Sequence, residues 1–235
     1  MDTREFLRRY AHVYLYVAAF FLGISALLRH SVETAGMAEP FLSRQVIVID
    51  AGHGGEDGGT TGVSGTAEDK VNLQIALRLE RMLTLMGCPT QMTRRDGGSL
   101  STEGQTIRAR KQSDLQNRVE MANRYPGAIL ISIHQNHFPD PQYHGAQVFH
   151  TADAQTLAES MQTALVESLS PGSRRRAKQA QGIYVMEHIT CPGLLVECGF
   201  LSNPEEEQKL QSPDYQKKLA AVMAAVLARY LDGQV

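Results

Sequence analysis

Two histidines and a glutamate occupy equivalent places in the sequence, at or just after the ends of apolar runs. His53 follows the run VIVID, His134 ends the run ILISI, and Glu197 ends the run LLV. Short runs of β-branched and aliphatic residues predict buried strands. Open α/β sheets bind their ligands at the carboxyl ends of their strands. We therefore expect these three residues to converge on one crevice.

The residue types favour a catalytic metal site. Two neutral imidazoles and one carboxylate form a zinc site whose fourth position remains for water. Such an ion lowers the pKa of the water and polarises a substrate carbonyl, and a second carboxylate passes the proton to the leaving amine. His53 and His134 are the best-placed histidines. Spacing alone leaves the ligand carboxylate open among four residues: Glu56, Asp57, Glu68 and Glu197.

Each of these residues also has an ordinary structural explanation. A single histidine after a strand is usually a polar loop residue. Glu68, near a helix start, is stabilised by the helix dipole alone, and Glu197 at a strand end would equally pair with an arginine. The coincidence of such residues at equivalent strand ends is what favours a site.

The elements that must position these residues alternate between strands and helices. Strands are predicted at residues 45–50, 89–93, 128–133, 146–150, 182–186 and 194–197. Helices are predicted at residues 66–86, 113–125, 154–169 and 214–231. This alternation predicts an α/β domain with a mainly parallel sheet.

The composition is that of a globular chain. Of its 235 residues, 43% are hydrophobic and 20% charged, and the formal net charge of −2 gives no basic excess for nucleic acid. One basic run, at residues 174–176, is interpreted as a solvated loop, with contact to an anionic polymer or lipid headgroup as the alternative. Cys191 and Cys198 flank one predicted strand, which is too long for a disulfide at roughly 23 Å. Together with Cys88 they are predicted to be buried thiols.

The N-terminal residues predict export. Residues 10–28 contain no Lys, Arg, Asp or Glu, and three arginines precede them while one follows. As a helix, this segment would span about 28 Å, close to a bilayer core. The more basic flank comes first, which places the N-terminus in the cytoplasm and the rest outside. Residues 1–29 are predicted to be a membrane anchor, with a cleaved signal as the alternative, and residues 30–44 a linker.

Four motifs resemble those of the zinc-dependent N-acetylmuramoyl-L-alanine amidases. In order, they are IVIDAGHGGEDGG, Glu68 with Leu73 five residues on, SIHQN, and LLVECGFLSNPEEE. The resemblance implies one catalytic domain at residues 45–235, with a mixed, mostly parallel sheet of about six strands flanked by helices. It also implies cleavage of the amide bond between N-acetylmuramic acid and L-alanine in peptidoglycan.

The resemblance extends to one subgroup and to individual residues. The stretch RKQSDLQNRVEMAN and the apolar N-terminus resemble germination-specific amidases, which help to make muramic-δ-lactam in the spore cortex. His53, Glu68 and His134 occupy the family's zinc-ligand positions, and Glu197 occupies the position of the catalytic acid/base. Asn136 also matches the pattern and is expected to position the substrate or the surroundings of the metal.

Two positions depart from the family pattern. Many relatives carry Glu-Lys at the second ligand, where this chain has Glu68-Asp69-Lys70. The spacing to Leu73 is kept, so Glu68 remains the expected ligand, with Asp69 as the fallback. Many relatives have a small residue after the Asn of SIHxN, where this chain has His137. A second imidazole there would alter substrate choice or metal occupancy.

Two rival functions remain open. A zinc peptidase would use the same ligands but cleave between amino acids, leaving no free L-alanine at the start of an intact stem peptide. An inactive wall-binding or regulatory module would keep the fold but tends to lose one of the four site residues. Because no glycan-binding domain is recognisable, we also hypothesise that a second protein targets this one to the wall or helps it to hold zinc.

Overall fold

The computed structural model describes residues 45–234. The predicted anchor or signal at residues 1–29 and the linker at 30–44 lie outside the described residues, and both stay predictions. Within residues 45–234, every helix is too short or too polar to cross a membrane.

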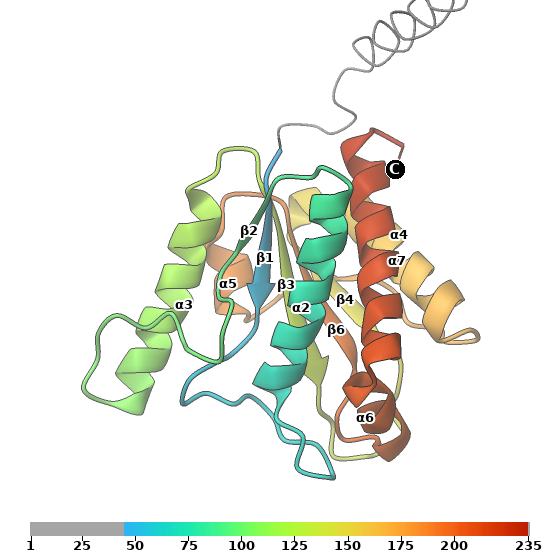
Figure 1. Ribbon diagram of the computed structural model, residues 1–235, viewed down its shortest axis with the longest axis horizontal. Helices are drawn as coiled ribbons and strands as arrows, with labels where there is room; N and C mark the ends of the chain where they lie inside the picture. The colour runs from blue at the N-terminus through green and yellow to red at the C-terminus, as the bar shows by residue number, and fades with distance from the viewer. Residues whose placement is uncertain (1–44, 235) are drawn as a thin grey trace, which may run out of the picture. The chain divides into compact units, whose positions relative to one another are not determined.

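A six-stranded sheet forms the centre of the domain (Figure 1). Its strands are β1 (Ile47–Ala51), β2 (Thr90–Met92), β3 (Ile129–Asn136), β4 (Gln147–His150), β5 (Lys178–Gln179) and β6 (Gly193–Phe200). Their order is β2-β1-β3-β6-β4-β5, and every pairing is parallel except that of β4 with β6. The predicted mixed, mostly parallel sheet of about six strands is therefore confirmed.

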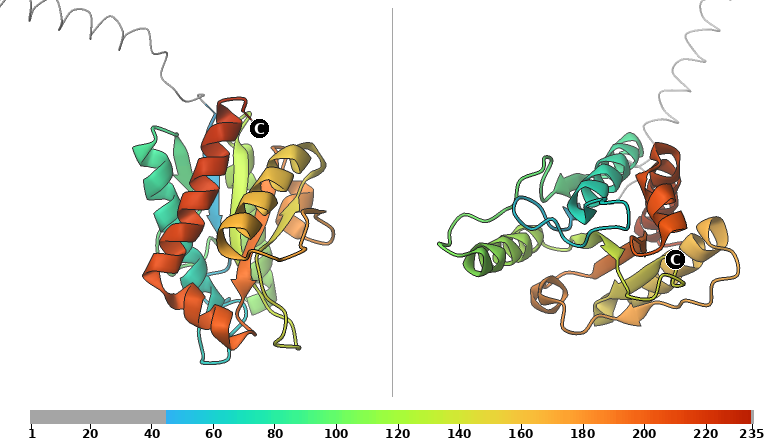
Figure 2. Two further views of the ribbon diagram at one scale, coloured as in Figure 1. Left: turned by 90° about the vertical axis from the view of Figure 1, so that its right-hand side faces the viewer. Right: turned by 90° about the horizontal axis from the view of Figure 1, so that it is seen from below.

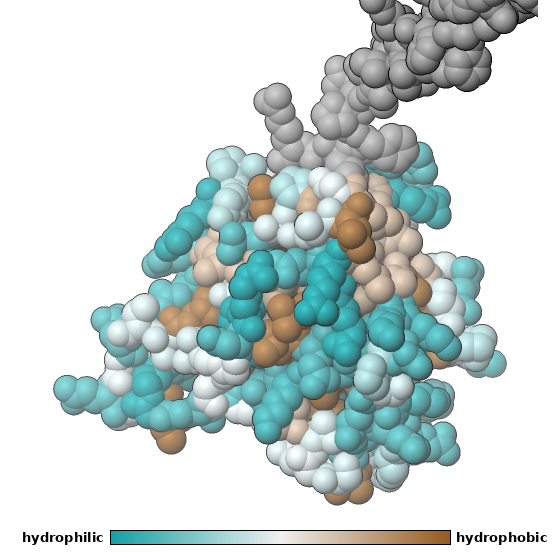
Figure 3. All heavy atoms as spheres, viewed as in Figure 1, coloured by the Kyte–Doolittle hydropathy of each residue, from teal (hydrophilic) through white to brown (hydrophobic). Residues whose placement is uncertain are grey.

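Helices cover both faces of the sheet (Figure 2). They are α2 (Glu68–Leu85), α3 (Ile107–Asn123), α4 (Gln155–Leu169), α5 (Tyr184–His188), α6 (Pro204–Gln211) and α7 (Pro213–Leu231), and a 3₁₀ turn, η1 (Ala152–Ala154), precedes α4. The larger core cluster contains apolar residues of α2, α4 and α7, and the smaller one contains residues of α3 and α5. On the face seen in Figure 3, hydrophilic side chains predominate, with smaller apolar areas between them.

The central strands are buried because helices cover both of their faces. All five residues of β1 are buried. Ile47 and Ile49 join the larger core, and Val48 between them joins the smaller one, as expected from the alternation of side chains along a strand. The three cysteines are free and buried, as predicted.

Of two helix boundaries, one agrees with the sequence prediction and the other does not. Helix α2 is followed by Gly87, whose φ of 79° makes it the left-handed residue that ends many helices, as predicted. Helix α3 begins at Ile107, six residues before the predicted start. The hydroxyl of Thr106 caps it by accepting a hydrogen bond from the Ala109 amide at 3.1 Å. The first turns of α3 are mostly exposed, so they carry no apolar periodicity.

The strand predicted at residues 182–186 is wrong, since this stretch contains the start of helix α5. The sixth strand is instead the short β5, whose two residues are exposed at the edge of the sheet. Val185 and Met186 are neighbours in sequence, and both are buried against the smaller core. A strand would have turned one of them away. Gly182, at a φ of 68°, leads the chain into this turn.

Candidate functional site

The loop after β1 turns back sharply at the carboxyl edge of the sheet, toward the lower edge of Figure 1. His53 has a φ of 61°, the one positive φ outside glycine in residues 45–234. Two buried arginines hold this backbone in place. Arg118 donates to the His53 carbonyl at 2.7 Å, and Arg94 donates to the Ala51 carbonyl at 2.9 Å. These bonds offset the cost of a left-handed residue without a glycine.

The predicted residues His53, Glu68 and His134 come together at this edge. Glu68 is the first residue of α2, and its Oε1 lies 3.4 Å from Nε2 of His53 and 3.0 Å from Nδ1 of His134. One donor atom from each residue lies within 4.8 Å of the other two. Of the four candidate carboxylates, Glu68 is the one that joins both histidines in the part of the chain that the structure describes.

Backbone and side-chain donors surround the Glu68 carboxylate. Its Oε2 accepts a hydrogen bond from the Thr60 amide at 2.9 Å, and its Oε1 accepts from the Gln135 amide at 3.1 Å. Burial alone would raise the pKa of Glu68, but the bonds and charges of His134 and His53 hold it far below its usual value. The group therefore stays a carboxylate at any physiological pH.

A second carboxylate orients His53. Asp57 Oδ2 lies 3.0 Å from Nδ1 of His53 and 3.0 Å from Nζ of Lys111 on α3. This contact leaves Nε2 of His53 facing Glu68, which is how carboxylates fix histidine ligands in metal sites. Burial lowers the pKa of His53, yet the carboxylates of Glu68 and Asp57 outweigh it and raise the pKa to about 9. The site is thus built to hold a positive charge.

Two glycines leave room for the side chains of His53, Glu68 and His134. A Cβ at Gly52 would lie 2.3 Å from the ring of His134. A Cβ at Gly59 would lie 2.5 Å from Glu68 Oε2, and Gly59 also has a φ of 67° that other residues rarely adopt. The Gly-rich loop is therefore required by the close approach of the three side chains.

Glu197 lies beside the group but has different surroundings. It pairs with His134 in the register of β3 and β6. Its Oε2 is buried and has no hydrogen-bond partner. Burial, with the negative charge of Glu68 adding to it, raises the pKa of Glu197 to about 7 against the opposing effect of His134. Such a group gains and loses a proton near neutral pH.

The other candidates lie around the group rather than in it. Asp69 is buried, and its carbonyl accepts a hydrogen bond from Arg94 at 2.8 Å, while its side chain takes no part in the three-residue group. Asn136 ends β3 after an irregularity in the pairing, and its carbonyl accepts from the Leu201 amide. His137 lines a neighbouring groove beside Phe138.

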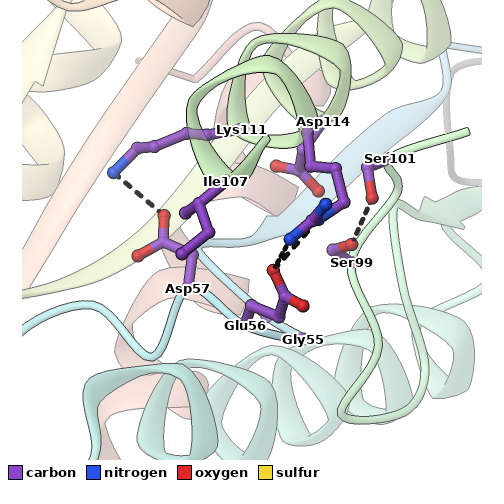
Figure 4. Close-up of a pocket in the computed structure, with 10 residues that line it drawn as sticks. Gly55, Glu56, Asp57, Ser99, Ser101, Ile107, Lys111 and Asp114 are labelled. Carbon is purple, nitrogen blue, oxygen red and sulfur yellow. Dashed lines mark hydrogen bonds and ion pairs between the residues drawn. The ribbon is translucent and has the colours of Figure 1, made fainter. Parts of the chain in front are cut away.

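A pocket of about 360 Å³ lies on the α3 side of the His53 loop (Figure 4). Four of its charged residues form two ion pairs. Arg110 bonds Glu56 at 2.5 Å, and Lys111 bonds Asp57 at 3.0 Å. Glu56 therefore belongs to this pocket and not to the candidate metal group.

A buried ion pair beneath the loop involves residues that the sequence did not single out. Arg118 donates to Asp50 Oδ1 at 2.5 Å and to Asp114 Oδ2 at 2.6 Å, and Ser132 donates to Asp50 Oδ2 at 2.6 Å. Burial alone would raise the pKa of Asp50, but the Arg118 guanidinium, together with the hydrogen bonds from Ser132 and Thr93 and the charge of His134, holds the pKa at about 2. In the sequence, the one signal is an aspartate at the end of the apolar run predicted as a strand at residues 45–50.

Fold and site together define an α/β protein with a two-histidine, one-glutamate group at the carboxyl edge of its sheet, beside a second glutamate. Residues 47–229 match the N-acetylmuramoyl-L-alanine amidase family. The chain therefore belongs to this family, and the predicted amidase class and family resemblance are confirmed.

Similarity to individual amidases supports membership of this family. The chain is 38% identical to the germination-specific N-acetylmuramoyl-L-alanine amidase of Bacillus subtilis, over 80% of this chain and 81% of that protein. Its structure is similar to that of the CwlD amidase from Clostridioides difficile in complex with the GerS lipoprotein, with a TM-score of 0.76, 33% identity, and coverage of 80% and 98%. It is also similar to AmiC2 of Nostoc punctiforme, with a TM-score of 0.69, 28% identity, and coverage of 81% and 98%.

Proposed function

We propose that this amidase is zinc-dependent and hydrolyses the amide bond between N-acetylmuramic acid and L-alanine in peptidoglycan. The observation that carries the proposal is the convergence of His53, Glu68 and His134, with the unpartnered oxygen of Glu197 beside them. Three ligands and one separate acid/base carboxylate are what metal-assisted amide hydrolysis requires.

The donor set fits zinc. Two imidazole nitrogens and one carboxylate oxygen are the ligands of many catalytic zinc sites, and the carboxylates of Glu68 and Asp57 beside His53 provide negative charge that favours a cation. When bound, zinc supplies a Lewis acid that polarises the scissile carbonyl and activates a water. Asp57 keeps His53 in the tautomer whose Nε2 faces the site.

In this proposal, Glu197 moves the proton. Its carboxylate takes a proton from the attacking water and delivers it to the nitrogen of the leaving L-alanine. A proton-transferring group works best with a pKa near the operating pH, and the burial of Glu197 raises its pKa in that direction. Asn136, at the end of the same strand as His134, is proposed to position the substrate.

The biological setting is also a proposal. The 38% identity to a germination-specific amidase supports a role in spore cortex maturation, through formation of muramic-δ-lactam. Action there takes place outside the cytoplasm, with residues 1–29 as membrane anchor or signal. The similarity to an amidase solved in complex with a lipoprotein supports a protein partner that activates or targets this chain.

Mass spectrometry of peptidoglycan fragments tests the proposed chemistry. The full-length chain, loaded with zinc, should release intact stem peptides that begin with L-alanine, and a chelator should abolish the release. Peptides cut between amino acids would instead identify a peptidase. If neither vegetative peptidoglycan nor spore cortex is cut, even with candidate partners added, the chain would be an inactive binding module.

A further inference from the structure

A second groove, of about 720 Å³, lies along the loop before β4 and the segment that leads into β5. Four cations line it within five residues of sequence: Arg174, Arg175, Arg176 and Lys178. The chain as a whole has a net charge of −2. This concentration of positive charge is therefore local and does not follow from the composition.

Most of these cations lack an acidic partner. Among the described residues 45–234, Arg174, Arg176 and Lys178 are exposed and form no ion pair. The pocket on the other side of the site differs, since both Arg110 and Lys111 are paired there. Unpaired cations in a groove create a positive potential that attracts anions.

The segment that carries these cations is anchored. Arg175 donates to the His144 carbonyl at 2.9 Å, and its guanidinium lies 4.7 Å from the ring centre of Phe200. Gln147 donates to the Arg176 carbonyl at 2.6 Å. Because the backbone is fixed at several points, less backbone freedom is lost when the neighbouring side chains bind a ligand in the groove.

The groove adjoins the proposed reaction centre. Gln147, which lines it, is the direct partner of Glu197 in the register of β4 and β6. Phe200, which packs against Arg175, ends the strand that carries Glu197. A substrate whose scissile amide lies at Glu197 can therefore extend into the groove by a few residues.

The chemistry of the substrate indicates which part enters. On one side of the scissile amide is a sugar chain, and on the other is a peptide that carries acidic groups and a terminal carboxylate. We propose that the basic groove binds the carboxylates of the stem peptide, so that the enzyme selects stems with free carboxylates over amidated ones. This inference rests on the proposed amidase function.

The test compares two synthetic muramoyl peptides of one sequence, one with free carboxylates and one with those groups amidated. The full-length chain with zinc should have a kcat/KM about tenfold higher for the free acid, since several exposed ion pairs each contribute modestly. The variant R174Q/R176Q/K178Q, which keeps Arg175, should bring this ratio close to one, mainly through KM. Salt should lower the ratio of the unmodified enzyme.

A matched control removes three exposed cations elsewhere. The variant R81Q/K218Q/R229Q changes the net charge equally on α2 and α7, outside the groove. It should keep the unmodified ratio, which separates a local effect from one of net charge. If it lowered the ratio as much as the groove variant, the inference would be overturned.

Other outcomes are equally decisive. An identical ratio in the unmodified enzyme and the groove variant would overturn the inference and leave the amidase function intact. If the ratio is equal in both proteins but the groove variant binds phosphatidylglycerol vesicles more weakly, and phosphatidylcholine vesicles equally well, the cations would instead bind lipid headgroups. Failure of the unmodified enzyme to cut either peptide at the L-alanine amide, even with candidate partners added, would overturn the proposed function and this inference with it.

Discussion

Glu68 and Glu197 both lie beside His134, but one is surrounded by donors and the other is not. The oxygens of Glu68 accept hydrogen bonds from two backbone amides and contact both histidines. Glu197 has a buried oxygen with no partner. Accordingly, the pKa of Glu68 is held far below its usual range, and that of Glu197 is raised to about 7.

The difference indicates that one crevice gives two identical side chains opposite pKa shifts through their surroundings, as their separate proposed roles require. A carboxylate that is permanently charged suits a cation, and one that titrates near neutral pH suits proton transfer. Four substitutions test this comparison, beginning with the one that should have the largest effect.

The largest effect should come from the carboxylate that contacts both histidines. The variant Glu68→Gln removes the charge that we propose holds zinc. Bound zinc should therefore fall to background, and kcat/KM should fall by about a thousandfold or more, as expected when several kcal/mol of metal assistance are lost. Metal content by atomic absorption and amide cleavage should decline together. A variant that kept stoichiometric zinc would show that Glu68 is not a ligand.

Glu197→Gln should separate activity from metal binding. Loss of the proton-transferring group should lower kcat by about 10² to 10⁴-fold, while zinc content remains that of the unmodified enzyme. The same two measurements, made side by side with Glu68→Gln, give the contrast. Loss of zinc from Glu197→Gln would mean that the two glutamates share the ligand role.

The next effect concerns the residue that orients a ligand. In Asp57→Asn, the contact with Nδ1 of His53 loses its charge, and such changes in metal sites typically cost about 10- to 100-fold in affinity or activity. Zinc affinity, measured by competition with a chromogenic chelator, should fall within that range. Glu56→Gln is the matched control, because Glu56 pairs with Arg110 and does not contact the histidines. An equal loss in both variants would point to a general electrostatic effect of the loop.

The sequence predicted the residues of the candidate site better than the buried contacts that hold the loop of His53 in place. His53, Glu68 and His134 stand in recognisable motifs, and the structure brings them together as predicted. The strands that carry the predicted site residues are apolar runs, which pattern analysis detects well. Their roles as ligands stay predictions.

The remainder depends on contacts that sequence patterns do not encode. Arg118 and Asp50 are 68 residues apart, yet they form a buried pair under the loop. Nothing local to either residue indicates that pairing. The wrong strand prediction at residues 182–186 has a related cause. Val185 and Met186 would be apolar in a strand or a helix, and only their packing against α3 and the sheet decides that they form a helix.

A third carboxylate, Asp50, extends the comparison to a group whose two oxygens both accept hydrogen bonds. Burial would raise its pKa, but Arg118, Ser132, His134 and Thr93 together hold the pKa at about 2, below its ordinary 3.8. A depressed pKa contributes stability that is present above the unfolded value and is lost as pH falls toward the folded one. The contribution is about 2 kcal/mol at neutral pH and should disappear between about pH 4 and pH 2.

Urea unfolding from pH 6 to pH 2 measures this loss. Ser132→Ala removes one hydrogen bond to Asp50, so it should cost about 1 to 2 kcal/mol at neutral pH and flatten the decline in acid, because the folded pKa of Asp50 moves back toward its usual value. Ser113→Ala serves as the control, since Ser113 is also a buried serine but bonds Thr102 rather than Asp50. The same acid-induced decline in all three proteins would show that carboxylates other than Asp50 cause it.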